Sequence, residues 1–470
     1  MRDRLTLNYG LGWEAEFPRH EINNRQNSFD PQAINPVSGT PGIVTFAGVN
    51  GTPKRAFATD LNNFGPRLGF AYQLSELGNT VLRGGAGIFH GPTVSNSIGD
   101  VAALGFSTSA SFVVSQATTQ SAFQLRDGLP AYSRPALTSG FGAVPVGARP
   151  TTAVSFFDRH QVAPISYQSN LSLQHEIGLD AMVEVGYIGN ISRHLTANDF
   201  SLNQVPPELM GPGDTQRLRP FPQFSDVRLI NPSIGKSTYH AGFVRVQRRF
   251  SDGFSLLAHY TRSRYMDDAE AANEYGITGS YMDAYRRDLD WGRSASDVPH
   301  HVVLTVLYEV RPFTRRRYLD AVLANWRLGV LETLQSGPPF TVVTAANTTN
   351  AFPAGPLRPD LAGDPELPSD QQTLSRWFNT SAFANPAPFT FGNSPRSVLR
   401  GPGIVTTDLT LEKSIALGGS KRLDVRIEAY NLLNRANFNI PGFTLGAADF
   451  GAISSARPAR TVQLGTRVSF

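Results

Sequence analysis

The sequence contains no cysteine, few charged residues and no long apolar run. Without cysteine, a disulfide scaffold and a Cys-ligated zinc site are both excluded. A membrane-spanning helix needs about 20 consecutive apolar residues, and no stretch of the chain supplies them. The formal net charge of +4 is small for 470 residues, and the basic run 315–317 falls in an expected short turn. We expect no nucleic-acid partner, because such a surface needs clustered basic residues with aromatic residues between them.

A secretory signal is also missing from the start of the sequence. Met1 is followed by Arg2, Asp3 and Arg4, and an alternating apolar pattern begins at Leu5. A signal peptide would instead show a basic stretch, an apolar run and a cleavage site. We therefore expect the chain to be a fragment of a larger protein or to have a wrongly assigned start.

Glycine, aromatic residues and period-two patterns are what the sequence has instead. Its 43 glycines and 10% aromatic residues suit strands and turns better than helices. The clearest strand covers residues 422–430, where Leu423, Val425 and Ile427 alternate with charged residues. One face of this strand must contact water, and the other is apolar. About twelve segments of this kind are present, each of roughly ten residues, which is the length that a tilted membrane strand needs.

Long and short gaps alternate between these segments. The long gaps cover residues 14–65, 90–165, 191–237, 266–298, 337–402 and 434–459. The short gaps cover residues 75–79, 178–180, 251–253, 312–322 and 416–420. An outer-membrane barrel has tight periplasmic turns and large external loops, whereas a soluble sandwich has no reason to shorten every second connection. The sequence predicts an all-β fold: a partial antiparallel transmembrane β-barrel of about 12 strands. A soluble β-fold is the alternative.

Two further features follow from the barrel interpretation. Prolines crowd residues 337–403, so we expect an irregular external loop there. Aromatic residues at strand ends beside the short gaps predict a girdle at one membrane interface. The residues of this aromatic girdle are Phe250, Phe254, Tyr308 and Trp326.

No residue set carries a catalytic, cofactor-binding or metal-binding signature. The acidic stretch 267–290 could supply oxygen ligands, but it lacks the spacing of a calcium loop and is better interpreted as a solvated external loop. The glycines near Gly84 lack the lysine and the helix of a phosphate loop, and no nucleophile elbow is present. Asn431, Asn434 and Asn437 could form a ligand-facing rim, but hydrogen bonding between a strand and a loop explains them better. We expect no enzyme and no cofactor.

Several segments together resemble the Oar-like group of TonB-dependent outer-membrane receptors. These segments are LTLNYGLGWE (5–14), GPRLGFAYQL (65–74), NTVLRGGAGIF (79–89), the strand 170–176 that leads to VEVGYIGNISRHL (183–195), YHAGFVRVQRRFSDGFSLLAHYTRSRYMDD (239–268), SDVPHHVVLTVLYEV (296–310), WRLGVLETLQSGPPFTV (326–342), RLDVRIEAYNLLNRANF (422–438) and the terminal strand that ends at Phe470. The resemblance implies the carboxyl-terminal part of a plugged 22-stranded barrel. It also implies a barrel-assembly signal in the last strand, at Val462, Leu464, Val468 and Phe470.

This resemblance implies one barrel domain over residues 1–470, truncated at its amino terminus and lacking the plug. Its expected location is the bacterial cell outer membrane, and its expected function is the uptake of an unidentified bulky nutrient. The expected partners are outer-membrane lipid, the barrel-assembly machinery, an extracellular ligand and, only through a missing plug region, the TonB system. The alternatives are a non-transporting surface protein for adhesion or matrix contact, and a secreted soluble β-rich binding domain.

Overall fold

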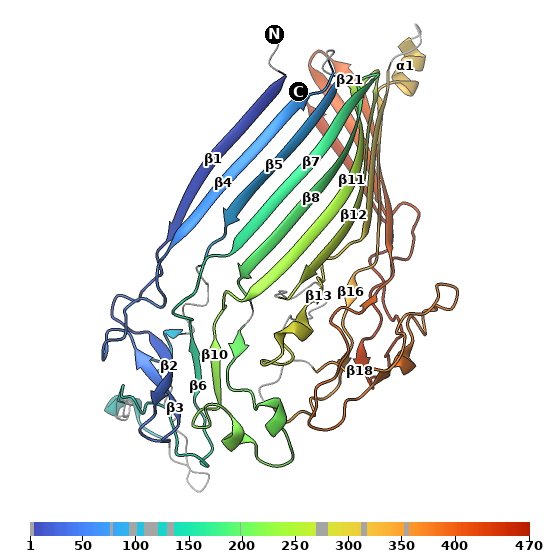
Figure 1. The fold of residues 1–470 in the computed structure, drawn as a ribbon. Coiled ribbons are helices and arrows are strands. Elements are labelled where there is room, and N and C mark those ends of the chain that lie inside the picture. Colours follow the sequence, from blue (N-terminus) through green and yellow to red (C-terminus); the bar gives the residue numbers. More distant parts are fainter. Residues whose placement is uncertain are drawn as a thin grey trace.

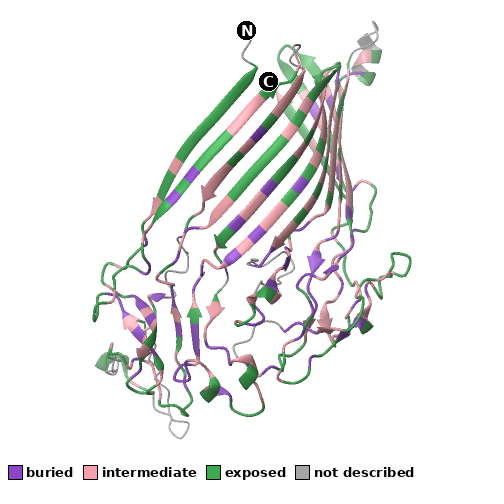
Figure 2. Cartoon of the chain, in the orientation of Figure 1, coloured by how far each residue is buried: buried purple, intermediate pink, exposed green. Residues whose placement is uncertain are grey.

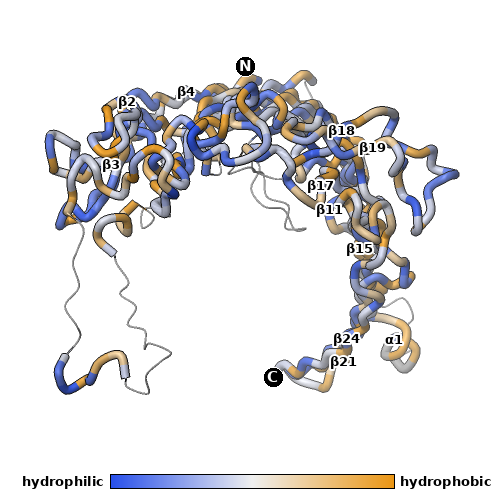
Figure 3. Tube along the Cα trace, turned by 90° about the horizontal axis from the view of Figure 1, so that it is seen from below, coloured by the Kyte–Doolittle hydropathy of each residue, from blue (hydrophilic) through white to orange (hydrophobic). Residues whose placement is uncertain are grey.

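The computed structural model describes residues 4–75, 79–93, 101–107, 121–128, 136–197, 199–268, 281–311, 317–351 and 357–470. One antiparallel sheet runs through this part of the chain, and it curves into an arc when seen along the strands (Figures 1 and 3). Its main path has twelve strands, which confirms the number expected from the sequence. In spatial order they are β1 (Leu5–Glu16), β4 (Asp60–Gln73), β5 (Thr80–His90), β7 (Ile165–Gly178), β8 (Ala181–Leu195), β11 (Gly235–Ser251), β12 (Phe254–Asp267), β14 (His300–Val310), β15 (Trp326–Gln335), β21 (Ile404–Gly418), β22 (Lys421–Tyr430) and β24 (Thr461–Ser469).

Each strand pairs with the one that precedes it and the one that follows it on this path, and β1 and β24 form the two edges. A short strand, β13 (Gly292–Arg293), adds to the end of β12. The short turns and both termini lie at one end of the sheet, at the top of Figure 1, and the long connections lie at the other end. The alternation of long and short connections is therefore confirmed.

Tight turns form where the backbone reaches positive φ. Asp252 (φ 52°) and Gly253 (φ 80°) join β11 to β12, as the Asp-Gly pair predicts for a two-residue hairpin. Leu179 (φ 53°) and Asp180 (φ 56°) join β7 to β8 in the same way, directly after Gly178 (φ 84°). The sequence signal is weaker there because leucine rarely adopts this conformation.

The connection expected at residues 312–322 differs from a plain turn, because it contains the helix α1 (Arg317–Leu323). Two side chains bind carbonyl oxygens at the carboxyl end of this helix. Trp326 Nε1 donates to the Val322 oxygen (2.8 Å), and Lys413 Nζ donates to the oxygens of Val322 and Ala324. These donors satisfy carbonyl groups that a helix end leaves free. Among the described residues, no helix is long and apolar enough to cross a membrane.

The long connections pack together into a structure that we call the loop body, formed by the described residues of 17–59, 91–164, 196–234, 268–299, 336–403 and 431–460. Its three-stranded sheet has β10 (Asp226–Leu229) between β6 (Ala153–Phe156) and β9 (Phe200–Ser201). Its two-stranded sheets pair β2 (Asn27–Ile34) with β3 (Pro41–Phe46), β16 (Pro339–Phe340) with β20 (Leu399–Arg400), β17 (Val343–Thr344) with β23 (Thr444–Leu445), and β18 (Asp360–Leu361) with β19 (Phe383–Ala384). Single-turn helices lie at η2 (Leu125–Asp127), η3 (Pro207–Leu209), η4 (Gln216–Leu218), η5 (Arg287–Asp290) and η6 (Thr380–Ala382).

The irregular loop expected at residues 337–403 is observed: its described residues hold only two-residue strands and one single-turn helix. Three of the small strand pairs use this stretch, and an aromatic cluster packs around Phe340, Phe378 and Phe383. The prolines do not prevent pairing because the paired segments are only two residues long. Pro339, for example, begins β16, a position where a missing N–H is tolerated.

The three buried apolar clusters lie in the loop body, where Figure 2 shows many of the buried segments. The sheet has a different distribution, because one of its faces exposes large apolar side chains. Leu7 is 58% exposed, Leu68 is 58% and Leu464 is 75%. We call this face, which contains most of the large apolar side chains of the strands, the outer face. So much contiguous apolar surface is suited to contact with lipid rather than with water.

Candidate functional site

The polar wall is the face of the twelve strands opposite the outer face, and the register of the sheet aligns its charges. Glu309, Arg327, Glu412 and Arg426 are successive cross-strand partners on β14, β15, β21 and β22. On the same face, nearer to β1, Gln174, Glu184 and Arg245 are cross-strand partners on β7, β8 and β11. Because opposite charges stand directly across from each other, the wall is polar without a strong excess of either sign.

Ion pairs form along this wall. Arg327 contacts Glu309 (Nε–Oε2, 3.3 Å) and Glu412 (Nη1–Oε1, 3.2 Å), so one guanidinium joins three strands. Arg426 contacts Glu428 (3.2 Å) on the same strand. The Arg327 side chain is 53% exposed. Pairs as exposed as this contribute little to stability, so they mainly keep the wall polar and hydrated.

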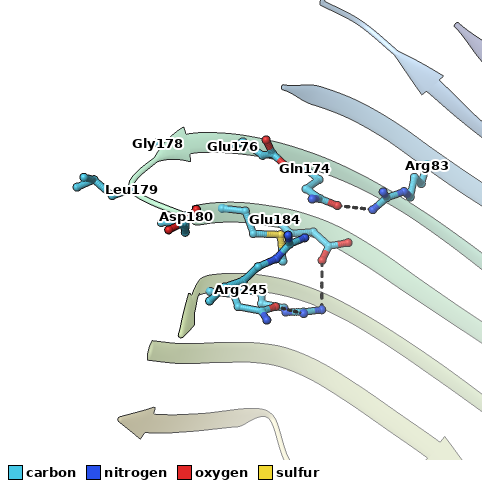
Figure 4. A pocket seen from close by; sticks show the side chains of 12 residues that line it. Arg83, Gln174, Glu176, Gly178, Leu179, Asp180, Glu184 and Arg245 are labelled. Atoms are coloured by element: carbon cyan, nitrogen blue, oxygen red, sulfur yellow. Dashed lines mark hydrogen bonds and ion pairs between the residues drawn. The ribbon is translucent and has the colours of Figure 1, made fainter. Parts of the chain in front are cut away.

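A recess of about 760 Å³ opens on the polar wall near the turn between β7 and β8 (Figure 4). Arg83 contacts Gln174 in the recess, and Arg245 Nη1 approaches Glu184 Oε2 at 3.6 Å. The Leu179 side chain lies apart from these polar groups in Figure 4. Because its lining carries amide, carboxylate and guanidinium groups, the recess is suited to binding a polar solute or polypeptide segment. Among the described residues, no group of three or more His, Asp or Glu side chains could hold a metal ion.

The loop body carries buried ion pairs, and these correct the interpretation of the acidic stretch 267–290 as a solvated loop. Arg358 Nη1 lies 2.7 Å from Asp290 Oδ1, and the two side chains are only 5% and 4% exposed. Arg396 pairs with Asp267, which is also buried. Asp268 accepts a hydrogen bond from the Lys236 amide (2.7 Å) and contacts Arg287. Asp283 is also buried, whereas Asp288 is exposed, and positions 270 and 274 lie outside the described residues.

These pairs join two long connections that are distant in the sequence. Arg358 also donates to the carbonyl oxygens of Ser394 and Leu289, both at 2.9 Å, so its guanidinium links residues 281–299 to residues 357–403. Arg400 pairs with Asp297 in the same region. Arg358, Arg396 and Arg400 could not be predicted from the sequence because no motif marks them. The sequence feature that could have indicated these ion pairs is the excess of acidic residues in one loop together with isolated arginines in the proline-rich loop.

Burial sets the proton affinity of the loop body groups. Desolvation raises the pKa of Asp290 above its usual range, although the charge of Arg358 acts in the opposite direction. Desolvation likewise raises the pKa of Asp268, against Lys236 and Arg287. The pKa of Tyr281 is raised to about 12, also mainly by burial.

The residues predicted to form the aromatic girdle and the barrel-assembly signal lie at strand ends and on the edge strand β24. Phe254 and Tyr308 are cross-strand partners, and Trp326 starts the next strand at the same end of the sheet. Val462, Leu464 and Val468 lie beside Ala429, Ile427 and Leu423 and extend the outer face onto the edge strand β24. Phe250 and Phe470 are 54% and 92% exposed.

The asparagine cluster after β22 forms local hydrogen bonds. Asn431 bonds to the backbone of Arg435, and the Asn437 side chain bonds to both backbone groups of Val405. These contacts support the hydrogen-bonding interpretation rather than the ligand rim.

An antiparallel sheet with an exposed apolar face, a charged opposite face and short turns at one end defines the wall of a β-barrel in the outer membrane. Residues 1–463 match the family model described as outer membrane beta barrel domain, and the chain belongs to this family. It is a protein of the bacterial outer membrane, with the short turns on the periplasmic side and the loop body outside.

Solved outer-membrane structures are similar to the chain at low sequence identity. The outer membrane transporter YddB from Escherichia coli is 9% identical, with a TM-score of 0.46 over 91% of this chain and 42% of that one. The FrpB iron transporter from Neisseria meningitidis (F3-3 variant) is 11% identical, with a TM-score of 0.44 over 98% and 43% of the two chains. The ferric yersiniabactin uptake receptor FyuA from Yersinia pestis is 11% identical, with a TM-score of 0.44 over 100% and 44%. The chain spans less than half of the length of these structures. No curated protein matches it.

Proposed function

We propose that this chain forms the barrel wall of a TonB-dependent receptor that takes up a bulky nutrient and performs no enzymatic reaction. The observation that carries the proposal is the mainly polar wall that extends over twelve strands. A barrel of about eight strands is filled by its own side chains, whereas much wider barrels enclose water or a plug. A wall of at least twelve strands therefore surrounds a lumen wide enough for a large solute, and its paired charges keep that lumen hydrated.

The loop body supports a receptor rather than an open pore. Buried aromatic clusters and ion pairs give the external loops a defined shape, which is what selective binding of a ligand requires. We propose that the ligand binds to this body and then passes along the polar wall. Energised passage requires a plug and a segment that contacts the TonB system, so we propose that these partners act together with the wall described here.

The sheet also fits one barrel domain that is completed by further strands. The edge strands β1 and β24 each have a neighbour on one side only among the described strands. Unpaired backbone groups cost several kcal/mol each in lipid, so these edges must be covered in the membrane. We propose that Phe250, Phe254, Tyr308 and Trp326 form the periplasmic aromatic girdle. We propose that the barrel-assembly machinery recognises Val462, Leu464, Val468 and Phe470 on β24.

Uptake by the bacterium that makes the protein tests this function. The probes are 55Fe-ferrichrome, cyanocobalamin and fluorescent maltohexaose, each given to a deletion strain and to a complemented strain, with and without a protonophore. Uptake of a probe that needs both the protein and the proton gradient is the expected result. Uptake that depends on the protein but persists with the protonophore would indicate a passive pore. If the deletion strain takes up every probe normally but no longer attaches to a matrix-coated surface, the adhesion alternative is correct.

A further inference from the structure

Four basic side chains gather on the outer face, which is otherwise apolar. His240 on β11 lies directly across from Arg264 on β12, and Arg262 on β12 lies across from His300 on β14. All four side chains are exposed. They share the outer face with residues such as Val244. The sequence number of each differs by an even number from those of the apolar outer-face residues of its own strand, as for His240 and Val244. We call these four residues the basic cluster.

Two tyrosines hold the imidazole rings of the basic cluster in place. Tyr187 Oη lies 2.6 Å from His240 Nδ1, and the two rings stack with their planes 21° apart. Tyr260 and His300 repeat this arrangement, with Oη 2.8 Å from Nδ1 and an angle of 23°. Because Nδ1 of each histidine is occupied, Nε2 is the atom left to meet Arg262 or a bound group. Arg262 Nη1 lies 3.0 Å from His300 Nε2.

The two arginines of the basic cluster lack the carboxylate partners that several other arginines of the protein have. Arg245 and Arg327 on the polar wall contact glutamates, and Arg358 and Arg396 in the loop body contact aspartates. Neither Arg262 nor Arg264 forms an ion pair with a carboxylate of the described residues. Two adjacent guanidinium groups repel each other unless an anion lies between them, so this site is complementary to an anion.

The position of the cluster along β12 identifies the anion's source. From Phe254, at the periplasmic end, to Arg264 is about ten residues, which is the length that a tilted strand needs to cross the hydrocarbon layer. An arginine on the lipid face is costly at the membrane centre but tolerated at an interface. The basic cluster therefore lies at the outer interface, where the headgroups of outer-leaflet lipids are found.

We propose that the basic cluster binds the phosphate groups of a phosphorylated glycolipid headgroup, of the lipid A type, in the outer leaflet. Guanidinium groups bind phosphate oxygens in a bidentate manner, and the Nε2–H of His240 adds a donor at the edge of the site. The acyl chains of the same lipid would cover the apolar outer face below the cluster. This inference depends on membership in the outer-membrane barrel family and not on the transport function proposed above.

Lipid retention by the protein extracted from outer membranes in mild detergent tests the proposal. Native mass spectrometry would count bound diphosphoryl lipid A for the wild type and for the double variant Arg262→Gln/Arg264→Gln. Arg248→Gln is the matched control, because Arg248 lies on the same outer face at the periplasmic end, above the Phe254 ring. We expect the double variant to lose roughly tenfold or more in apparent affinity and the control to lose little.

Two additional measurements keep the result interpretable. The variant Arg262→Lys/Arg264→Lys retains the charge but not the bidentate geometry, so it should bind less tightly than the wild type and more tightly than the glutamine variant. This order would link the loss in the glutamine variant to its lost charge rather than to misfolding. Lipid A without its phosphates should bind poorly, and inorganic phosphate should compete only weakly. Equal binding of the dephosphorylated lipid, an equal loss in Arg248→Gln, or full displacement by millimolar inorganic phosphate would each overturn the proposal.

Discussion

Replacing Asp290 with asparagine tests whether buried ion pairs hold the external loops together. The Asp290 and Arg358 side chains are 4% and 5% exposed and lie 2.7 Å apart. Asparagine keeps the shape of the side chain but leaves the guanidinium of Arg358 buried without its counter-charge. Removing one partner of a buried pair costs about 3–5 kcal/mol, because the remaining charge stays desolvated. The other contacts of Arg358, to the oxygens of Ser394 and Leu289, do not supply a negative charge.

This cost is large enough to be visible in local opening. At about 1.4 kcal/mol for each factor of ten, the loop body should open roughly a hundredfold to several thousandfold more often in Asp290→Asn. Hydrogen–deuterium exchange on peptides from residues 281–298 and 357–403 measures this change directly. The strands of the sheet should exchange as in the wild type, because Asp290 contacts none of them.

Two comparison variants separate charge burial from other effects. Asp288→Asn removes an exposed carboxylate that pairs with Arg286 at 2.9 Å, two residues from Asp290, and should change exchange little. The double variant Asp290→Leu/Arg358→Met removes both buried charges and should recover much of the lost protection. The reasoning is refuted if Asp290→Asn and Asp288→Asn behave alike, or if the double variant exchanges faster than the single one.

Three further predictions follow from the two faces of the sheet and from the loop body. Leu409→Arg places a charge on the outer face and should reduce folding stability in lipid vesicles by about 2–4 kcal/mol. Thr410→Arg, one residue away on the polar wall, should cost far less. Equal losses in a urea titration would contradict the assigned faces. Glu332 lies on the outer face, where Thr407 Oγ1 donates to its carboxylate at 2.5 Å. Glu332→Leu removes this charge from the lipid face and should raise folding stability in the same assay by about 1 kcal/mol. A loss of stability would show that the carboxylate has a partner in the membrane. The pKa of Tyr281 in the folded protein, about 12, exceeds its usual value of 10.0. The neutral phenol therefore stabilises the loop body below pH 10, and this contribution disappears as the pH rises from 10 to 12. A tyrosinate absorbance titration should show one late-titrating group that Tyr281→Phe removes, and its persistence in that variant would rule out the assignment.

The sheet could be predicted from the sequence because its signals are local. Residues such as Leu423 and Arg422 reveal the two faces by alternation alone, and Asp252 with Gly253 marks a turn by backbone preference. The loop body could not be predicted in this way. Asp290 and Arg358 belong to different connections, and two-residue strands such as β16 have no period to detect. Their partners are decided by packing between distant segments, which one sequence does not display.

The basic cluster shows the same limit at closer range. The alternation places His240 and Arg264 on the outer face, but it does not reveal that they are neighbours. That relation depends on the register between β11 and β12, which is set by the Asp252–Gly253 turn and by a bulge between Arg248 and Ser251. A shift of one residue in that register would separate the histidine from the arginine and move one of them to the polar wall.

The location of the apolar clusters in the loop body has a thermodynamic consequence. Unfolding of the loop body exposes Phe340, Phe378 and their neighbours to water, and exposure of apolar surface raises the heat capacity. The outer face of the sheet becomes exposed to water only if the whole wall leaves the membrane. Calorimetry in lipid should therefore resolve two transitions: an earlier one with a large heat-capacity step from the loop body, and a later one governed by the bilayer. The loop body would then lose stability on cooling as well as on heating, while the barrel wall keeps its structure.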